Sequence, residues 1–95
     1  MSSEDLERYE SEIELALYTE YRDVISMFKY VVETERRFYL ANGVQRTSSP
    51  TDTFIEYALT DCWVWDMYRK SRFLASVTVA STRGITVEEL PVPEI

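Results

Sequence analysis

The side chains that could support catalysis in this 95-residue chain are almost all carboxylates. The sequence has no histidine, one cysteine (Cys62) and two glycines (Gly43 and Gly84). Histidine is the side chain best suited to proton transfer near neutral pH and the commonest metal ligand, so catalytic triads and histidine metal sites are excluded. One cysteine excludes thiolate clusters and an internal disulfide, and two separate glycines exclude a glycine-rich phosphate loop. We therefore expect no cofactor and no metal.

Asp61 and Asp66 are the acids placed most suggestively, because both lie in the apolar stretch from Phe54 to Tyr68. Buried carboxylates need partners, and a pair of them can catalyse hydrolysis or bind a hard cation. Residues five positions apart, however, point to opposite faces of an unbroken strand. We interpret Asp66 as the partner of an arginine, and the candidates are Arg36, Arg37, Arg69 and Arg72. No catalytic dyad is predicted, and a carboxylate-dependent hydrolase ranks last among the candidate functions.

A second constellation combines aromatic and basic side chains: Phe38, Tyr39, Tyr57, Trp63, Trp65 and Tyr68, with Arg36, Arg37, Arg69, Lys70 and Arg72 nearby. Aromatic residues on a sheet flanked by arginines can stack single-stranded bases, so an RNA-binding domain is the alternative function. Core packing is the simpler account for the tryptophans, since they share the strand parity of neighbouring aliphatic residues. Tyrosine and arginine are common interface anchors. The exposed part of this constellation therefore predicts a protein-docking surface of Tyr39, Tyr68, Arg69 and Arg72.

The long stretch that holds these residues alternates with a period of two, which is typical of a strand. Its heavier apolar residues share one parity and predict the core face: Ile55, Tyr57, Leu59, Trp63, Trp65 and Met67. The stretch is longer than the usual ~5 to 6 residues, and Asp61 interrupts the apolar face. We expect a bulge or bend near Thr60 and Asp61, or two shorter strands that meet there.

The N-terminal third predicts an amphipathic helix from about Glu4 to about Ser26, capped by the preceding serines. Its core-facing stripe consists of Leu6, Tyr9, Ile13, Ala16, Leu17, Tyr21, Val24 and Phe28. Leu15 and Tyr18 lie outside that stripe with Ile25 and could form a second apolar patch for a partner.

The remaining chain predicts strands joined by short turns. Residues 27–34 favour a strand, although continuation of the helix stays open, and strands follow over 37–46, 73–80 and 85–90. Asn42 and Gly43 could mark a kink. Short connections imply antiparallel neighbours. We predict an α+β fold, an N-terminal amphipathic helix packed on an antiparallel sheet of four to five strands, with one domain over 1–90 and a flexible C-terminal tail over 91–95.

The formal net charge of −7 lies wholly at the N-terminal end, where residues 1–35 contain ten acids and three bases. This imbalance suits a partner with a basic protein surface and disfavours phosphate backbones and anionic membranes, although a solvated helix face that keeps the protein soluble is the simpler explanation. The first residues, MSSEDLERYE, are acidic where a signal peptide is basic and then apolar, and no apolar run approaches the ~18 residues of a membrane span. We expect a cytoplasmic protein and leave its oligomeric state open.

Several stretches resemble a small actinobacterial family known only as a domain of unknown function. They are EDLERYESE (4–12), EYRDV (20–24), YVVETERRFYLAN (30–42), WVWDMYR (63–69), Arg72-Phe73 and VEEL (87–90). The chain departs from the family at about residues 45–54, so that loop receives no family role. The resemblance implies no activity or catalytic residue. It implies a cytoplasmic protein, often encoded near a ribonuclease H type gene and ribosomal or secretion genes.

Together these observations predict a non-catalytic interaction or regulatory module that docks onto a larger assembly, in transcription, translation or RNA metabolism. The predicted partner-binding residues are Glu12, Glu14, Leu15 and Tyr18 on the helix, and Tyr39, Tyr68, Arg69 and Arg72 near the long strand.

Overall fold

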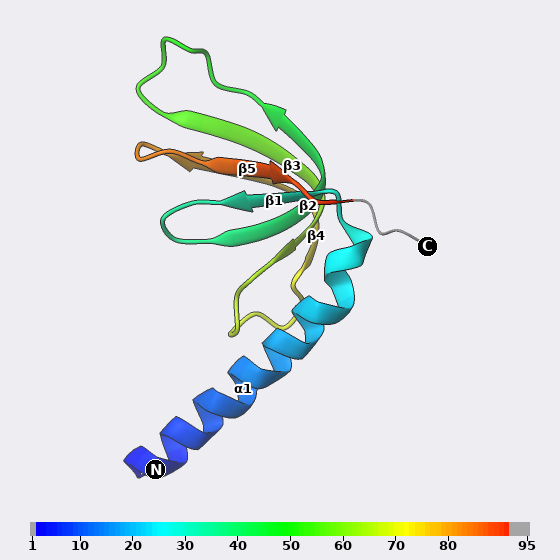
Figure 1. Ribbon diagram of the computed structural model, residues 1–95. Coiled ribbons are helices and arrows are strands. Elements are labelled where there is room, and N and C mark those ends of the chain that lie inside the picture. The colour runs from blue at the N-terminus through cyan, green and yellow to red at the C-terminus, as the bar shows by residue number, and fades with distance from the viewer. Residues whose placement is uncertain (1, 92–95) are drawn as a thin grey trace.

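The computed structural model describes residues 2–91 (Figure 1). Helix α1 (Ser3–Val24) continues into one turn of 3-10 helix, η1 (Ile25–Met27). Five strands follow: β1 (Tyr30–Glu33), β2 (Phe38–Arg46), β3 (Ile55–Val64), β4 (Phe73–Ser81) and β5 (Thr86–Glu89). The predicted α+β class, with one N-terminal helix on an antiparallel five-stranded sheet, is confirmed. Of the predicted tail, residues 92–95 lie outside the described residues.

Helix α1 begins where the sequence predicts. Ser2 is the N-cap, and its Oγ accepts a hydrogen bond from the backbone N–H of Asp5 at 3.2 Å. Acidic residues in the first turn and Arg22 in the last turn complement the helix dipole. Of residues 27–34, Met27 still belongs to the 3-10 turn, and the predicted strand is confirmed over Tyr30–Glu33.

The sheet has the order β4-β3-β2-β1-β5, and every neighbouring pair is antiparallel. Ser81 at the end of β4 donates a hydrogen bond from Oγ to Oε2 of Glu35, in the β1–β2 turn, at 2.7 Å. In a flat sheet these residues would lie roughly 30 Å apart, near opposite ends of β2. The sheet therefore curls round on itself, and a four-residue link connects its two edge strands, β4 and β5.

This curled sheet encloses one core, and the helix covers a second. The inner cluster contains residues of the strands alone: Val32, Tyr39, Ala41, Leu59, Cys62, Val64 and Val79. The outer cluster lies between the end of the helix and the sheet: Leu17, Val24, Phe28, Leu40 and Trp63. A single core on one sheet face, as the alternation in residues 54–68 predicts, is therefore wrong.

The two clusters lie on opposite faces of the sheet, and on β3 the alternation between them shifts at Asp61, near which an irregularity is predicted. Asp61 has φ 50°, in the left-handed region. Leu59 and Cys62, three residues apart, both belong to the inner cluster, whereas Trp63 belongs to the outer one. β3 nevertheless continues as one strand through this point and ends at Val64, before the predicted Tyr68.

The neighbouring strand is adapted to the same irregularity. Gly43 faces Thr60 across β2 and β3, and a Cβ atom at this glycine would overlap Oγ1 of Thr60. Next to it, the Asn42 amide donates hydrogen bonds to Asp61 Oδ2 at 2.7 Å and to the backbone carbonyl of Met27 at 3.1 Å. Asn42 and Gly43, where the sequence suggests a kink, lie within the continuous strand β2, and Asn42 contacts Met27, the last residue of η1.

Candidate functional site

The two suggestive carboxylates have structural partners. Asp66 Oδ2 accepts a hydrogen bond from Nη1 of Arg37 at 2.9 Å, and Oδ1 accepts one from the backbone N–H of Tyr68. The hydrogen bond from Arg37 is the main reason that the pKa of Asp66 lies below its usual value. Asp61 is exposed and accepts the hydrogen bond of Asn42. The predicted pairing of Asp66 with an arginine is confirmed, with Arg37 as the partner.

The remaining titratable groups in the described part of the chain are mostly dispersed or already paired. Among residues 2–91, no group of three or more acids or cysteines is placed to hold a metal ion. Cys62 is buried, and burial raises the pKa of its thiol, which makes it a poor nucleophile. A hollow of about 440 Å³ lies between the β1–β2 turn and β4. Its carboxylate, Glu35, already accepts the Ser81 hydroxyl, and this hydrogen bond lowers the pKa of Glu35.

The four docking residues predicted near the long strand divide into two groups. Tyr39 is only 8% exposed and lies in the inner cluster, where burial raises the pKa of its hydroxyl. The Arg72 side chain is 14% exposed, and its guanidinium pairs with Glu20 at 2.8 Å. Tyr68 and Arg69 are exposed in the segment between β3 and β4. These four residues therefore do not form one continuous surface.

The helix residues of the predicted site are all exposed. Glu12 and Glu14 face solvent, and the large side chains of Leu15 and Tyr18 are 69% and 59% exposed. Leu6 and Tyr9, predicted to be core, are about half exposed. That prediction is wrong because the 22-residue helix is about 33 Å long and the sheet covers only its C-terminal turns. Figure 1 shows the N-terminal end of α1 well away from the sheet. We call residues Ser3 to Ala16 the free half of α1.

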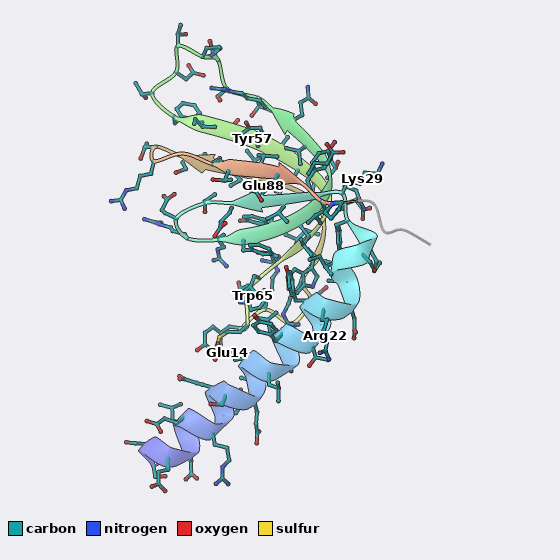
Figure 2. All side chains as sticks on the ribbon, in the orientation of Figure 1. Glu14, Arg22, Lys29, Tyr57, Trp65 and Glu88 are labelled. Atoms are coloured by element: carbon teal, nitrogen blue, oxygen red, sulfur yellow. The ribbon has the colours of Figure 1, made fainter. Side chains whose placement is uncertain are left out.

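Four aromatic rings meet where the free half ends. Tyr18 and Tyr21 come from α1, Phe38 begins β2, and Trp65 follows β3 directly. In every pair except Tyr18 and Phe38, the ring centroids are 5.3 to 6.3 Å apart in edge-to-face arrangements. The rings line a hollow of about 340 Å³, which we call the aromatic pocket. Figure 2 shows Trp65 beside the helix.

A second, smaller hollow of about 240 Å³ adjoins the aromatic pocket at Tyr18. It is lined by Ser11, Glu14, Leu15 and Tyr18, so Tyr18 belongs to both hollows. Sequence patterns assign Tyr21, Phe38 and Trp65 to the core and miss this pocket. The position of Tyr18 outside the apolar stripe is the signal that points toward it.

Comparisons with known proteins agree with the resemblance seen in the sequence. The family model described as "Protein of unknown function (DUF2469)" matches residues 1–95. Uncharacterized proteins from Mycobacterium bovis and from two strains of Mycobacterium tuberculosis are each 53% identical over 97 residues, covering 100% of this chain and 96% of theirs. No solved structure matches the chain significantly. Among the described residues, no helix is both long and apolar enough to cross a membrane.

Proposed function

The chain belongs to this family of proteins of unknown function, and we propose that it is a non-catalytic interaction module that docks onto a larger cytoplasmic protein. The observation that carries the proposal is the exposure of the free half of α1. Leu6, Tyr9 and Leu15 are each 48% exposed or more, so about four helical turns present apolar side chains to solvent. Large apolar side chains gathered on one exposed element are characteristic of interaction sites.

The acidic charge of the free half indicates which kind of partner surface would bind it. It carries six carboxylates and one arginine, a net charge of −5. Two copies of this helix would bring like charges together, which opposes self-association through this face. A partner that offers apolar side chains flanked by lysine and arginine satisfies both the apolar stripe and the acids around it. The proposed partner is therefore a protein with a basic, partly apolar groove or helix.

Single-stranded RNA is the weaker alternative. Trp63 is fully buried and Tyr39 nearly so, which leaves neither ring available for stacking on a base. The acidic helix beside the exposed rings repels a phosphate backbone. The predicted roles in transcription, translation or RNA metabolism would then come from the partner rather than from direct contact with nucleic acid.

The test is affinity purification of the tagged full-length chain from its own cells, with protein and RNA analysed in the bound material. The decisive variant is Glu12→Lys with Glu14→Lys, which reverses charge on the free half. Glu88→Lys with Glu89→Lys is the matched control, because it makes the same charge change on exposed residues of edge strand β5.

We expect a stoichiometric protein with a basic surface that the helix variant loses and the β5 variant retains, and that is released by salt. RNA recovered without protein would replace the proposal with the alternative. Equal recovery by the helix variant and the wild type would show that the free half of α1 is not the docking surface.

A further inference from the structure

The aromatic pocket is a built site whose walls come from three separate parts of the chain. Tyr18 and Tyr21 are three residues apart and lie on the same side of α1. The backbone N–H of Trp65 donates to the carbonyl of Phe38 at 2.9 Å, which fixes these two residues beside each other. The Tyr18 and Trp65 rings are perpendicular, with centroids 5.4 Å apart, and the Phe38 and Trp65 rings are nearly so. The pocket thus has rigid walls of different orientation.

Tyr21, Phe38 and Trp65 pack against the edge of the outer cluster and are only partly buried. In the outer cluster itself, Trp63 and Leu40 are fully buried. The pocket rings instead remain partly accessible, and Tyr18 is 59% exposed at the rim. A hollow of about 340 Å³ between four aromatic rings is large enough to admit the end of a long side chain. The parts of the four rings that line this hollow therefore remain available to a ligand.

The chemistry of the walls selects a cation. The face of an aromatic ring carries partial negative charge and attracts guanidinium or ammonium groups placed over it, and cages of several rings are typical binding sites for alkylated ammonium groups. Glu14 lines the adjoining hollow and shares Tyr18 with the pocket. The carboxylates of the free half add a negative field around the opening. An anionic group would meet repulsion from both sources.

We propose that the aromatic pocket of Tyr18, Tyr21, Phe38 and Trp65 binds the cationic end of an arginine or lysine side chain from a protein partner. The ligand's neighbouring apolar residue then lies against Leu15, and a second basic residue pairs with Glu14. This inference rests on the proposed docking function for the source of the side chain, but the binding chemistry is testable without the partner.

The test uses the two tryptophan indole N–H signals in ¹H–¹⁵N spectra of the full chain. Trp65 is in the pocket and reports binding. Trp63 is fully buried, with its Nε1–H bonded to Glu20, and serves as the internal control. The probes are capped pentapeptides Gly-Leu-Xaa-Leu-Gly in which the central residue is arginine, lysine, trimethyllysine, citrulline or norleucine.

We expect a saturable shift of the Trp65 signal with the three cationic peptides and little change at Trp63. Citrulline and norleucine preserve size without charge and should bind at least about fivefold more weakly, the effect of losing one cation–π contact. Tyr18→Ala should weaken the cationic peptides similarly. Tyr9→Ala, the same change on the helix outside the pocket, should leave binding unaltered.

Equal binding of the arginine and citrulline peptides, or no Trp65 shift at millimolar peptide, would overturn the proposal. Its failure is distinguishable from failure of the docking function. If the partner purified from cells depends on Glu12 and Glu14 but not on Tyr18, the helix surface stands and the pocket has no role. If peptides bind the pocket but no partner is recovered, the cation site stands and the docking function loses its support.

Discussion

Trp63 donates its indole N–H to Oε1 of Glu20 across 2.6 Å, and the other oxygen of this carboxylate accepts a hydrogen bond from Arg72 at 2.8 Å. Glu20 is on α1, Trp63 is on β3, and Arg72 directly precedes β4. One carboxylate therefore connects the helix to two strands. Because Tyr18 and Tyr21 flank Glu20 in the helix, this connection also sets the position of two walls of the aromatic pocket.

Replacing Glu20 with alanine should lower the free energy of unfolding by about 2 to 4 kcal/mol, because it leaves a buried indole donor and a largely buried guanidinium unpaired. Urea unfolding followed by tryptophan fluorescence measures the change. Glu12→Ala removes a carboxylate from the exposed part of the same helix and should change stability by no more than about 0.5 kcal/mol. Equal effects of the two variants would mean that Glu20 contributes only surface charge.

The Arg37–Asp66 pair should make stability depend on pH in the acid range. The pKa of Asp66 is lowered from a usual value of 3.8, mainly by the hydrogen bond from Arg37. Between the two pKa values the unfolded chain binds more protons than the folded one, so stability rises with pH there and is lost as pH falls below about 4. The Arg37 side chain is 49% exposed, which limits the contribution to about 0.2 to 1 kcal/mol.

Urea unfolding from pH 7 to pH 2.5 would measure this dependence. Asp66→Asn and Arg37→Gln should each abolish the same part of the stability loss seen at acid pH. The double variant should abolish no more of it than either single variant. Additive effects would show that the two side chains act independently. The matching variant Glu35→Gln should affect only the separate contribution of the Glu35–Ser81 hydrogen bond, since the two contacts share no residue.

Local sequence patterns predicted the elements of the fold because the signals for them are local. Ser2 caps α1, the strand after Met27 follows from alternation, and Asp61 marks the irregularity in β3. The curling of the sheet was not predictable in this way. It depends on contacts such as Ser81 with Glu35, between residues far apart in sequence. Because the alternation shifts at Asp61, odd and even residue numbers in β3 no longer tell which residues belong to the inner cluster and which to the outer one.

For the candidate site, the sequence predicted the acidic helix but not how much of it lies free. The apolar stripe through Leu6 and Tyr9 is the pattern of a core-facing helix, and nothing in it shows that the sheet is too short to cover these residues. Trp65 has the strand parity of a core residue, yet β3 ends before it and its ring joins the helix tyrosines. The exposure of the α1 side chains and the position of Trp65 both depend on where the helix and the strands end. Local sequence patterns predict the ends of elements least well.

Gly43→Ala should lower the free energy of unfolding by about 1 to 3 kcal/mol, because the added methyl group overlaps Oγ1 of Thr60 and forces this side chain to rotate or the two strands to shift. Thr60→Ala in the same chain removes that oxygen and should recover part of the loss. A double-mutant cycle by urea unfolding measures the coupling between the two positions. Absence of coupling would mean that the glycine is needed for backbone conformation rather than for the close approach.

In a strand, alanine is usually more stabilising than glycine, and at position 61 we expect the opposite. The φ of Asp61, 50°, lies in the left-handed region, where a Cβ atom costs about 1 kcal/mol in alanine and nothing in glycine. Both Asp61→Ala and Asp61→Gly lose the hydrogen bond from the Asn42 amide, so their difference isolates the backbone term. Asp61→Gly should therefore be the more stable of the two by about 1 kcal/mol. Asp61→Asn keeps an acceptor, tolerates this conformation and should be close to the wild type.

The matched control for this order is Ala58→Gly, three residues earlier in the same strand, where φ is not positive. There the loss of the methyl group should destabilise the chain in the ordinary direction, by about 0.5 to 1 kcal/mol. Thermal and urea unfolding of the four variants measure this order of stability. If Asp61→Ala were as stable as Asp61→Gly, the backbone at this residue would be able to relax out of the left-handed region, and the shift in alternation that separates Leu59 from Trp63 would need another cause.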